Sequence, residues 1–264
     1  MRNQSSGVCI FCGGLPLSRE HVIPRWTEKV IAQDQRTVAN RMHYRYVEQG
    51  GVKINEQRWQ GTEEPKFIAK CVCKDRCNSG WMEDIENEAA PILTEMMLNR
   101  AVTLDRQAQD RVSNWLGLKA IIDGYSHTPI TPMPREWINY VYVHHTSPLT
   151  WNMRVGRYIG AHVHRVARGE IDARIIHPLT PIRTKRKAFV FTIAMGYFFG
   201  QVIGFRDKMI LPFSRDFFSQ IWPHPLLRAD MPDGASSYFE MWPPKRWLTD
   251  PDFENVAHDL SEPR

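Results

Sequence analysis

Apolar and polar residues alternate through much of residues 37–73, which is the pattern of strands with one buried face. Gly50 and Gly51 interrupt this alternation, and paired glycines are typical of a turn between two strands. Candidate strands lie before this turn, at residues 52–54 and at residues 66–69. The pattern therefore predicts a small antiparallel sheet in this part of the chain.

A short strand and a short helix are predicted upstream of this segment. Val22 and Ile23 favour a strand, and Pro24 cannot donate to a central ladder of hydrogen bonds, so we expect His21 on a strand that ends there. Residues 26–31 are expected to form a short helical turn.

The pattern changes to helical spacing after residue 77. Apolar residues recur every three or four positions from Trp81 to Met96, and acidic residues crowd the first turns, where the helix dipole favours negative charge. We therefore predict a helix that opens at Asn78 and is kinked or split by Pro91. A second helix is predicted to begin after Asp105, whose side chain can cap its N-terminus.

The rest of the chain is predicted to be rich in strands. A short helix is expected near its end, because Asp250 followed by Pro251 is typical of a helix start. The basic run at residues 183–187 is expected in an exposed loop. The candidate strands are residues 137–144, 151–166, 188–194 and 197–205, the last two joined by a turn at Met195 and Gly196.

These patterns predict an α+β protein. The length of 264 residues, with 42% hydrophobic and 24% charged residues, is typical of a globular chain that can bury a sizeable core. We place a boundary near residues 100–105. It separates a domain at residues 1–100 from a helical and β-rich domain at residues 101–264 that has no assigned role.

Composition and charge exclude few classes of binding partner. No apolar run approaches the roughly 18 residues that span a bilayer, and the first residues lack the apolar segment of a signal peptide. We therefore expect a cytoplasmic protein with no membrane partner. The formal net charge of +5 favours polyanions, but without a local pattern it does not identify nucleic acid.

The five cysteines all lie in the first third of the chain, where they form two close pairs with one thiol left over. Two thiol pairs can supply the four ligands of a tetrahedral zinc ion, and in a reducing compartment such pairs favour metal over disulfides. The alternative is a set of buried free thiols. The predicted zinc ligands are Cys9, Cys12, Cys73 and Cys77, with Cys71 as the alternative to Cys73.

Two further motifs carry a resemblance to a known family. The segments Glu20–Trp26 (EHVIPRW) and Cys77–Met82 (CNSGWM), together with the thiol pairs, resemble zinc-containing HNH endonucleases of the ββα-metal class. The resemblance implies a zinc-stabilised hairpin and helix, here with the predicted antiparallel sheet inserted between the two thiol pairs. Many members also carry an Asn on the strand before the second thiol pair, and residues 65–72 contain none.

The resemblance also implies roles for three residues. His21 would act as the general base, for which a neutral imidazole with an ordinary pKa of about 6.5 is suited. Glu20 and Asn78 would hold a catalytic Mg²⁺ or Mn²⁺ ion, because such ions prefer oxygen ligands. The expected function is metal-dependent hydrolysis of phosphodiester bonds in DNA.

Other interpretations remain open at this point. Arg41, His43 and Arg45 share one face of a predicted strand and are candidate contacts with DNA phosphates, or else part of a solvated outer face. A non-catalytic, zinc-stabilised nucleic-acid-binding or regulatory protein is the alternative function. The sequence leaves the oligomeric state undetermined, a homodimer included.

Overall fold

A computed structural model describes residues 7–32, 42–49, 52–60, 67–126, 133–176, 183–206, 218–222 and 240–259. The chain is an α+β protein, as predicted, and most of its strand pairs are antiparallel. In chain order the elements are β1 (Leu17–His21), α1 (Trp26–Ile31), β2 (Met42–Gln49), β3 (Val52–Gln60), β4 (Ile68–Cys73), η1 (Lys74–Met82), α3 (Glu83–Met97), β5 (Val102–Leu104), α4 (Arg106–Asp123), α5 (Arg135–His144), β6 (Trp151–Tyr158), β7 (His162–Ile176), β8 (Arg183–Met195), β9 (Phe198–Gly204), β10 (Phe218–Trp222), β11 (Glu240–Trp242), β12 (Trp247–Leu248) and α6 (Asp250–Asp259).

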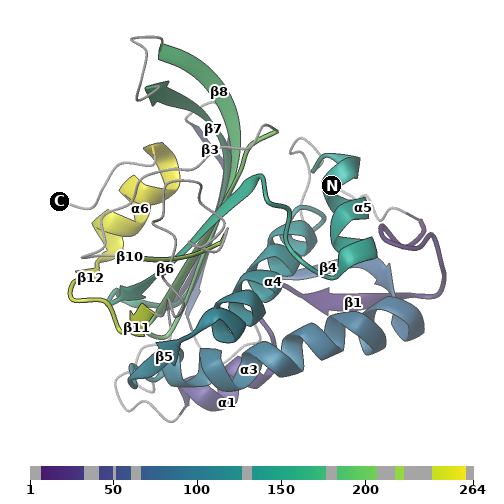
Figure 1. Cartoon of the computed structure of the whole chain (residues 1–264), viewed down its shortest axis with the longest axis horizontal. Coiled ribbons are helices and arrows are strands. Elements are labelled where there is room, and N and C mark those ends of the chain that lie inside the picture. The colour runs from purple at the N-terminus through teal and green to yellow at the C-terminus, as the bar shows by residue number, and fades with distance from the viewer. Residues whose placement is uncertain are drawn as a thin grey trace, which may run out of the picture.

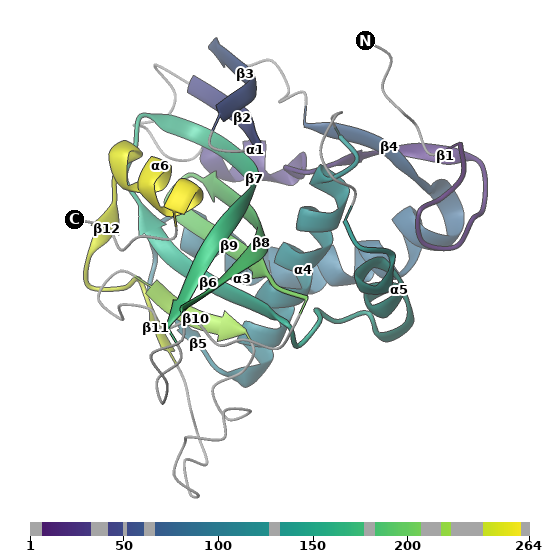
Figure 2. The ribbon, with the colours of Figure 1, turned by 90° about the horizontal axis from the view of Figure 1, so that it is seen from above.

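A large sheet forms the centre of the molecule. Its eight strands run in the order β10-β6-β9-β8-β7-β2-β3, with β12 beside β6. Helix α4 packs against one side of this sheet and α6 against the other (Figure 1). Strand β9 is buried along its whole length, because both faces of the sheet are covered there. The pair β1/β4 and helix α3 lie on the far side of α4 (Figure 2).

The antiparallel pair β1/β4 carries the first candidate residues. Glu20 lies opposite Ala69, and His21 lies opposite Ile68 at the end of the pair. The predicted strand at His21 is present, but it ends at His21 and not at Pro24, and the predicted helix at residues 26–31 is confirmed. Because neighbouring residues of a strand point to opposite sides, Glu20 and His21 leave the strand in different directions.

The chain leaves β4 through η1, a π-helical segment with a break near its end. The break lies at Ser79 and Gly80, where Gly80 has φ −120° and ψ −126°, angles that glycine adopts more readily than other residues. Asn78 therefore precedes α3 and does not open a continuous helix. Helix α3 runs through Pro91 without interruption, so the predicted split at Pro91 is wrong.

The predicted strands before and after Gly50 and Gly51 are present as β2 and β3, which pair in antiparallel fashion, and the second is longer than the predicted residues 52–54. This pair is not a separate sheet, because β2 also pairs in parallel with β7 and so joins the eight-stranded sheet. Strand β4 pairs with β1 instead. The segment between the two thiol pairs thus contributes to two different sheets.

Strands β6 to β9 form the middle of the large sheet. Residues 151–166 contain two strands and not one, because the chain turns between Tyr158 and His162. Strands β8 and β9 form the predicted hairpin, whose turn places Gly196 at φ +56°. The basic run 183–187 lies in β8, where it pairs with β7, so its assignment to a loop is wrong.

Residues 137–144 belong to α5 and do not form the predicted strand. Trp137, Ile138 and Val141 are buried and lie on one face of this helix. The aromatic and β-branched residues of the segment favour a strand by propensity. Packing of a single helical face against the core outweighs that preference here.

Helix α4 crosses the middle of the molecule. Asp105 caps its start as predicted, since its carboxylate accepts a hydrogen bond from the backbone N–H of Ala108 over 2.8 Å. The helix contacts α3 and β4 on one side and β9 and β10 on the other. One hydrophobic core therefore runs from Cys9 to Trp242, across the boundary predicted at residues 100–105. Among the helices described, none is long and apolar enough to cross a membrane.

Asp250, the first residue of α6, ties this helix to the large sheet. Its carboxylate accepts hydrogen bonds from Tyr158 Oη at 2.5 Å, Ala161 N at 2.9 Å and Arg165 Nη1 at 2.6 Å, and it contacts His162 Nδ1 at 3.0 Å. Burial alone would raise the pKa of Asp250, but the hydrogen bonds and the Arg165 charge hold it well below its usual value.

We expect Asp250→Asn to destabilise the fold by about 2 kcal/mol, because hydrogen bonds to a charged group are lost and Arg165 loses an ionic partner. A depressed pKa stabilises the folded state above the ordinary carboxyl pKa of about 4, and this stabilisation is lost as the pH falls. The difference in unfolding free energy between the two proteins should therefore shrink from pH 6 to pH 3. Urea unfolding at several pH values measures it.

Glu95→Gln is the matched control for this measurement. Glu95 pairs with Arg100 over 3.2 Å at an exposed position. Such surface pairs contribute about 0–1 kcal/mol. A loss of stability equal to that of Asp250→Asn would contradict the role assigned to Asp250.

Candidate functional site

Four cysteine side chains converge where the N-terminal segment meets η1. Cys9 and Cys12 lie in the turn before β1, Cys73 ends β4, and Cys77 lies within η1. Their sulfur atoms all lie within 4.8 Å of one another. The Sγ atoms of Cys9 and Cys77 are 3.7 Å apart, and those of Cys12 and Cys73 are 3.4 Å apart.

This four-cysteine group fits a zinc ion. Four ligands at about 2.3 Å from a tetrahedral zinc ion lie about 3.8 Å from one another, close to the two measured separations. The backbone N–H of Gly14 lies 3.4 Å from Cys12 Sγ and donates to it. Burial alone would raise the pKa of Cys12, but this hydrogen bond and those with the other thiols lower it to about 7. The group can therefore hold a metal ion such as zinc.

Cys73 and not Cys71 is one of the four clustered cysteines. Cys71 is also buried, and burial together with the charge of Glu20 raises the pKa of its thiol. Burial raises the pKa of Cys73 and of Cys77 as well, so the position of its sulfur atom, and not its pKa, separates Cys71 from the four clustered cysteines. The structure thus brings together the four cysteines predicted as ligands.

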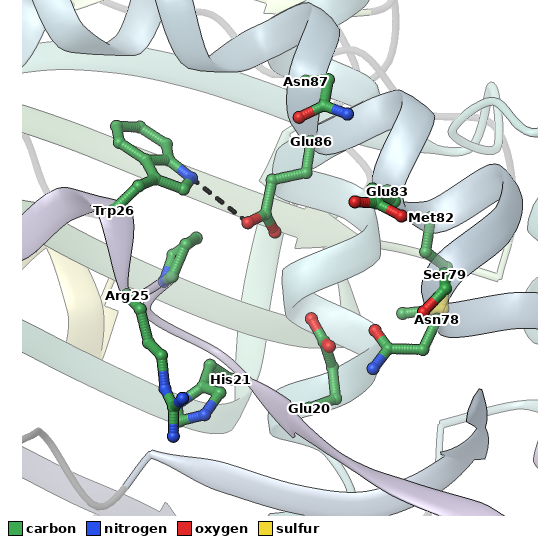
Figure 3. A pocket seen from close by; sticks show the side chains of 11 residues that line it. Glu20, His21, Arg25, Trp26, Asn78, Ser79, Met82, Glu83, Glu86 and Asn87 are labelled. Carbon is green, nitrogen blue, oxygen red and sulfur yellow. Dashed lines mark hydrogen bonds between the residues drawn. The ribbon is translucent and has the colours of Figure 1, made fainter. Parts of the chain in front are cut away.

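A pocket of about 290 Å³ lies between the end of β1 and the start of α3 (Figure 3). Glu20, His21 and Arg25 line it from β1 and the residues that follow, and Asn78 and Glu83 line it from η1 and α3. The remaining lining residues are Pro24, Trp26, Ser79, Met82, Glu86 and Asn87. The three residues predicted to be catalytic therefore line one pocket.

Glu20 forms an ion pair that the sequence does not predict. It is nearly buried, and its Oε1 accepts a hydrogen bond from Lys119 Nζ over 2.7 Å. Lys119 also donates to Glu86 Oε2 over 2.8 Å. Burial alone would lower the pKa of Lys119, but the charges of Glu20 and Glu86 outweigh it and hold the pKa above its usual value. Two carboxylates that line the pocket are therefore joined by one buried cation.

Asn78 is oriented by a residue of β1. Its Nδ2 donates to Ser18 Oγ over 3.0 Å, and Ser18 Oγ in turn donates to the backbone oxygen of Val72 over 3.2 Å. The amide of Asn78 points toward the carboxylate of Glu20 (Figure 3). Since Nδ2 faces Ser18, Oδ1 is the atom of Asn78 that can accept a hydrogen bond or bind a cation.

Helix α5 packs over the turn that holds Cys9 and Cys12. Arg135 Nη1 donates to the backbone oxygen of Ile10 over 2.5 Å. The ring of Phe11 stacks on Tyr142 with centroids 6.2 Å apart. The ring of Trp81, just after the break in η1, stacks on His145 at 4.8 Å. The four-cysteine group is therefore supported by a helix from outside the first hundred residues.

Of the three predicted phosphate contacts, His43 and Arg45 are not among the residues that line this pocket. His43 and Arg45 lie on β2, in the large sheet, and Arg41 lies outside the described residues. The part of the pocket lining that the structure describes includes no residue of β2. Their role stays a prediction.

Lys119 and Glu86 are the site residues that the sequence analysis missed. In the sequence, Glu86 is one of several acidic residues that favour the start of a helix, which gives no indication of a buried partner. A signal for Lys119 exists, because it follows Leu118 and lies one turn after Trp115, on the apolar side of a predicted helix. A lysine at such a position requires a buried partner.

Comparisons with models of protein families, with curated protein sequences and with solved structures found no significant match to this chain. The chemistry available to the site must therefore be argued from its own residues. They comprise an imidazole, carboxylates, an amide oxygen and an exposed guanidinium around one pocket, next to a group that can hold zinc. Such a set can bind a divalent cation and an anionic substrate and can accept a proton.

Proposed function

We propose that this chain is a metal-dependent endonuclease of the HNH type that hydrolyses phosphodiester bonds in DNA. One observation carries the proposal: His21, Glu20 and Asn78 line a single pocket, and Asn78 directly follows a cysteine of the four-cysteine group. The resemblance of the EHVIPRW and CNSGWM segments supplies the reaction type. Zinc in the four-cysteine group would fix η1 against β1 and so hold Asn78 near Glu20.

His21 is the general base in this proposal. It is half-buried at the end of β1, and it lines the pocket. Its imidazole would take a proton from the water that attacks the phosphorus atom. Its backbone oxygen accepts a hydrogen bond from Lys119 over 2.9 Å, so the position of this residue is fixed independently of its side chain.

Glu20 and Asn78 would hold Mg²⁺ or Mn²⁺. The donors fit such an ion, because carboxylate and amide oxygens are hard ligands and Oδ1 of Asn78 is left free of the bond to Ser18. When bound, the ion would stabilise negative charge on the scissile phosphate and on the leaving oxygen. Glu83 lines the same pocket and can accept hydrogen bonds from water around the ion.

Arg25 supports an anionic substrate. It is exposed at the rim of the pocket that His21 lines, so its guanidinium can contact a phosphate of the bound strand. We propose further phosphate contacts by Arg41, His43 and Arg45, in keeping with the net charge of +5.

The second candidate function is a zinc-stabilised nucleic-acid-binding or regulatory protein without catalysis. Two observations favour it. Lys119 occupies one oxygen of Glu20, and residues 65–72 lack the Asn that orients the base in many HNH enzymes. A protein that retained the zinc-binding frame and lost the reaction would show both features.

Incubation of the zinc-loaded protein with supercoiled plasmid separates the two candidates. We expect nicked or linear DNA when Mg²⁺ or Mn²⁺ is added, and none when it is omitted. Omission is preferable to a chelator, because a chelator would also remove zinc. Retarded migration of intact plasmid, with no cleavage under either ion, would favour the binding protein.

A further inference from the structure

Lys119 is a fully buried cation whose hydrogen bonds all lead to the candidate site. Its side chain is 0% exposed. It donates to Glu20 Oε1, the backbone oxygen of His21 and Glu86 Oε2 over 2.7, 2.9 and 2.8 Å. An ammonium group has three N–H donors, so this set of partners uses all of them. Lys119 is therefore held in one position by groups from β1 and α3.

The ammonium group lies between two carboxylates that would otherwise attract a divalent cation. Glu20 approaches it from β1 and Glu86 from α3. A buried charge is stable only when it is paired, and here the candidate site itself supplies the pairs. The three side chains together carry a net charge of about −1, where the two carboxylates alone would carry about −2.

Glu86 has a second partner besides Lys119. Its Oε1 accepts a hydrogen bond from Trp26 Nε1 over 3.2 Å, shown as the dashed line in Figure 3. Both oxygens of Glu86 are therefore engaged with protein donors. Glu20 differs, because Lys119 engages its Oε1 while the amide of Asn78 points toward its carboxylate.

We propose that Lys119 is a positioning residue that acts as a fixed internal cation, so that the pocket binds one divalent ion and not two. This inference rests on the proposed function, in which Glu20 and Asn78 hold the ion. Lys119 holds Glu20 through one oxygen and presents the rest of its carboxylate to Asn78. Lys119 also neutralises the charge of the Glu86 carboxylate, which weakens the attraction between Glu86 and a divalent ion.

A cycle of substitutions at Lys119 and Glu86 tests this role through Mn²⁺ binding. The local net charge is about −2 in Lys119→Met, −1 in the wild type, 0 in Glu86→Gln and −1 in the double variant. We therefore expect Lys119→Met to bind a second Mn²⁺ or to bind the first at least about tenfold more tightly. Glu86→Gln should bind about tenfold more weakly, and the double variant should return to within about threefold of the wild type.

The measurement uses the full-length, zinc-loaded protein without DNA, with free Mn²⁺ followed by electron paramagnetic resonance. The double variant removes one charge of each sign. Comparison of the double variant with Glu86→Gln therefore gives the effect of Lys119 on Mn²⁺ binding, even if Lys119→Met does not fold. Lys53→Met is the control for overall charge, because Lys53 pairs with Glu254 away from the pocket. It should leave Mn²⁺ binding unchanged.

Two results would overturn the inference. In one, Lys119→Met does not tighten Mn²⁺ binding, either in the wild-type protein or in the Glu86→Gln protein. In the other, no variant binds Mn²⁺. In the first case Lys119 is only an ion pair that joins α4 to α3. The expected order of affinities in a protein that fails to cleave DNA would support the role of Lys119 and contradict the proposed nuclease activity. Failure of the two proposals is therefore distinguishable.

Discussion

His21→Ala should lose about two to four orders of magnitude in the rate of plasmid cleavage, which is the typical contribution of a positioned general base. The fold should persist, because Lys119 binds the backbone oxygen of residue 21 and not its imidazole. Mn²⁺ and DNA binding should also persist. Cleavage rates under single-turnover conditions, measured beside zinc content and DNA affinity, would establish this combination of effects.

His144→Ala is the matched control, since His144 lies on α5, away from the residues that line the pocket. It should cleave at the wild-type rate. Added imidazole should restore part of the activity of His21→Ala and leave that of the control unchanged, because only the first variant lacks a base. Undiminished cleavage by His21→Ala would show that this residue is not the base or that the activity belongs to a contaminant.

Cys12→Ser should lose bound zinc and unfold the part of the chain around it. Binding of a structural zinc ion contributes about 10–16 kcal/mol in small zinc-dependent modules, so its loss exceeds the stability of a typical domain. We expect less than one zinc per chain by elemental analysis, a lower melting temperature and poor solubility. Full zinc occupancy in this variant would contradict the four-cysteine assignment.

Cys71→Ala is the control for the loss of a thiol. Cys71 is buried near the group but is not one of the four clustered cysteines. Its replacement by Ala should cost about 1–2 kcal/mol through lost packing and leave the zinc content at one per chain. Loss of zinc in both variants would indicate that zinc content follows general stability and not ligation.

Local signals predicted the elements around the site well. The strand at His21, the cap at Asp105 and the hairpin turn at Gly196 all follow from residues that lie close together in sequence. The clustering of the four cysteines could also be predicted from the sequence, because a tetrahedral zinc ion requires four ligands close together.

What the sequence did not predict depends on contacts between distant segments. Alternation identified the hairpin β2/β3, but nothing local to it indicates that β2 pairs with β7. The strand propensity of residues 137–144 yields to packing against a core formed by other elements. The pairing of Lys119 with Glu20 joins residues from the two predicted domains, so it becomes visible only once α4 is placed beside β1.

The support that α4 and α5 give to the site bears on how this protein could be divided or recombined. Residues 1–100 contain every motif that resembles a nuclease, yet Lys119 and Arg135 lie beyond them. A fragment cut at residue 100 would leave Glu20 without its counter-charge and expose the apolar surface that α4 covers. The segment that contains the nuclease-like motifs is therefore not sufficient by itself to form the site. A chimeric protein that contains this site would also need α4 and α5.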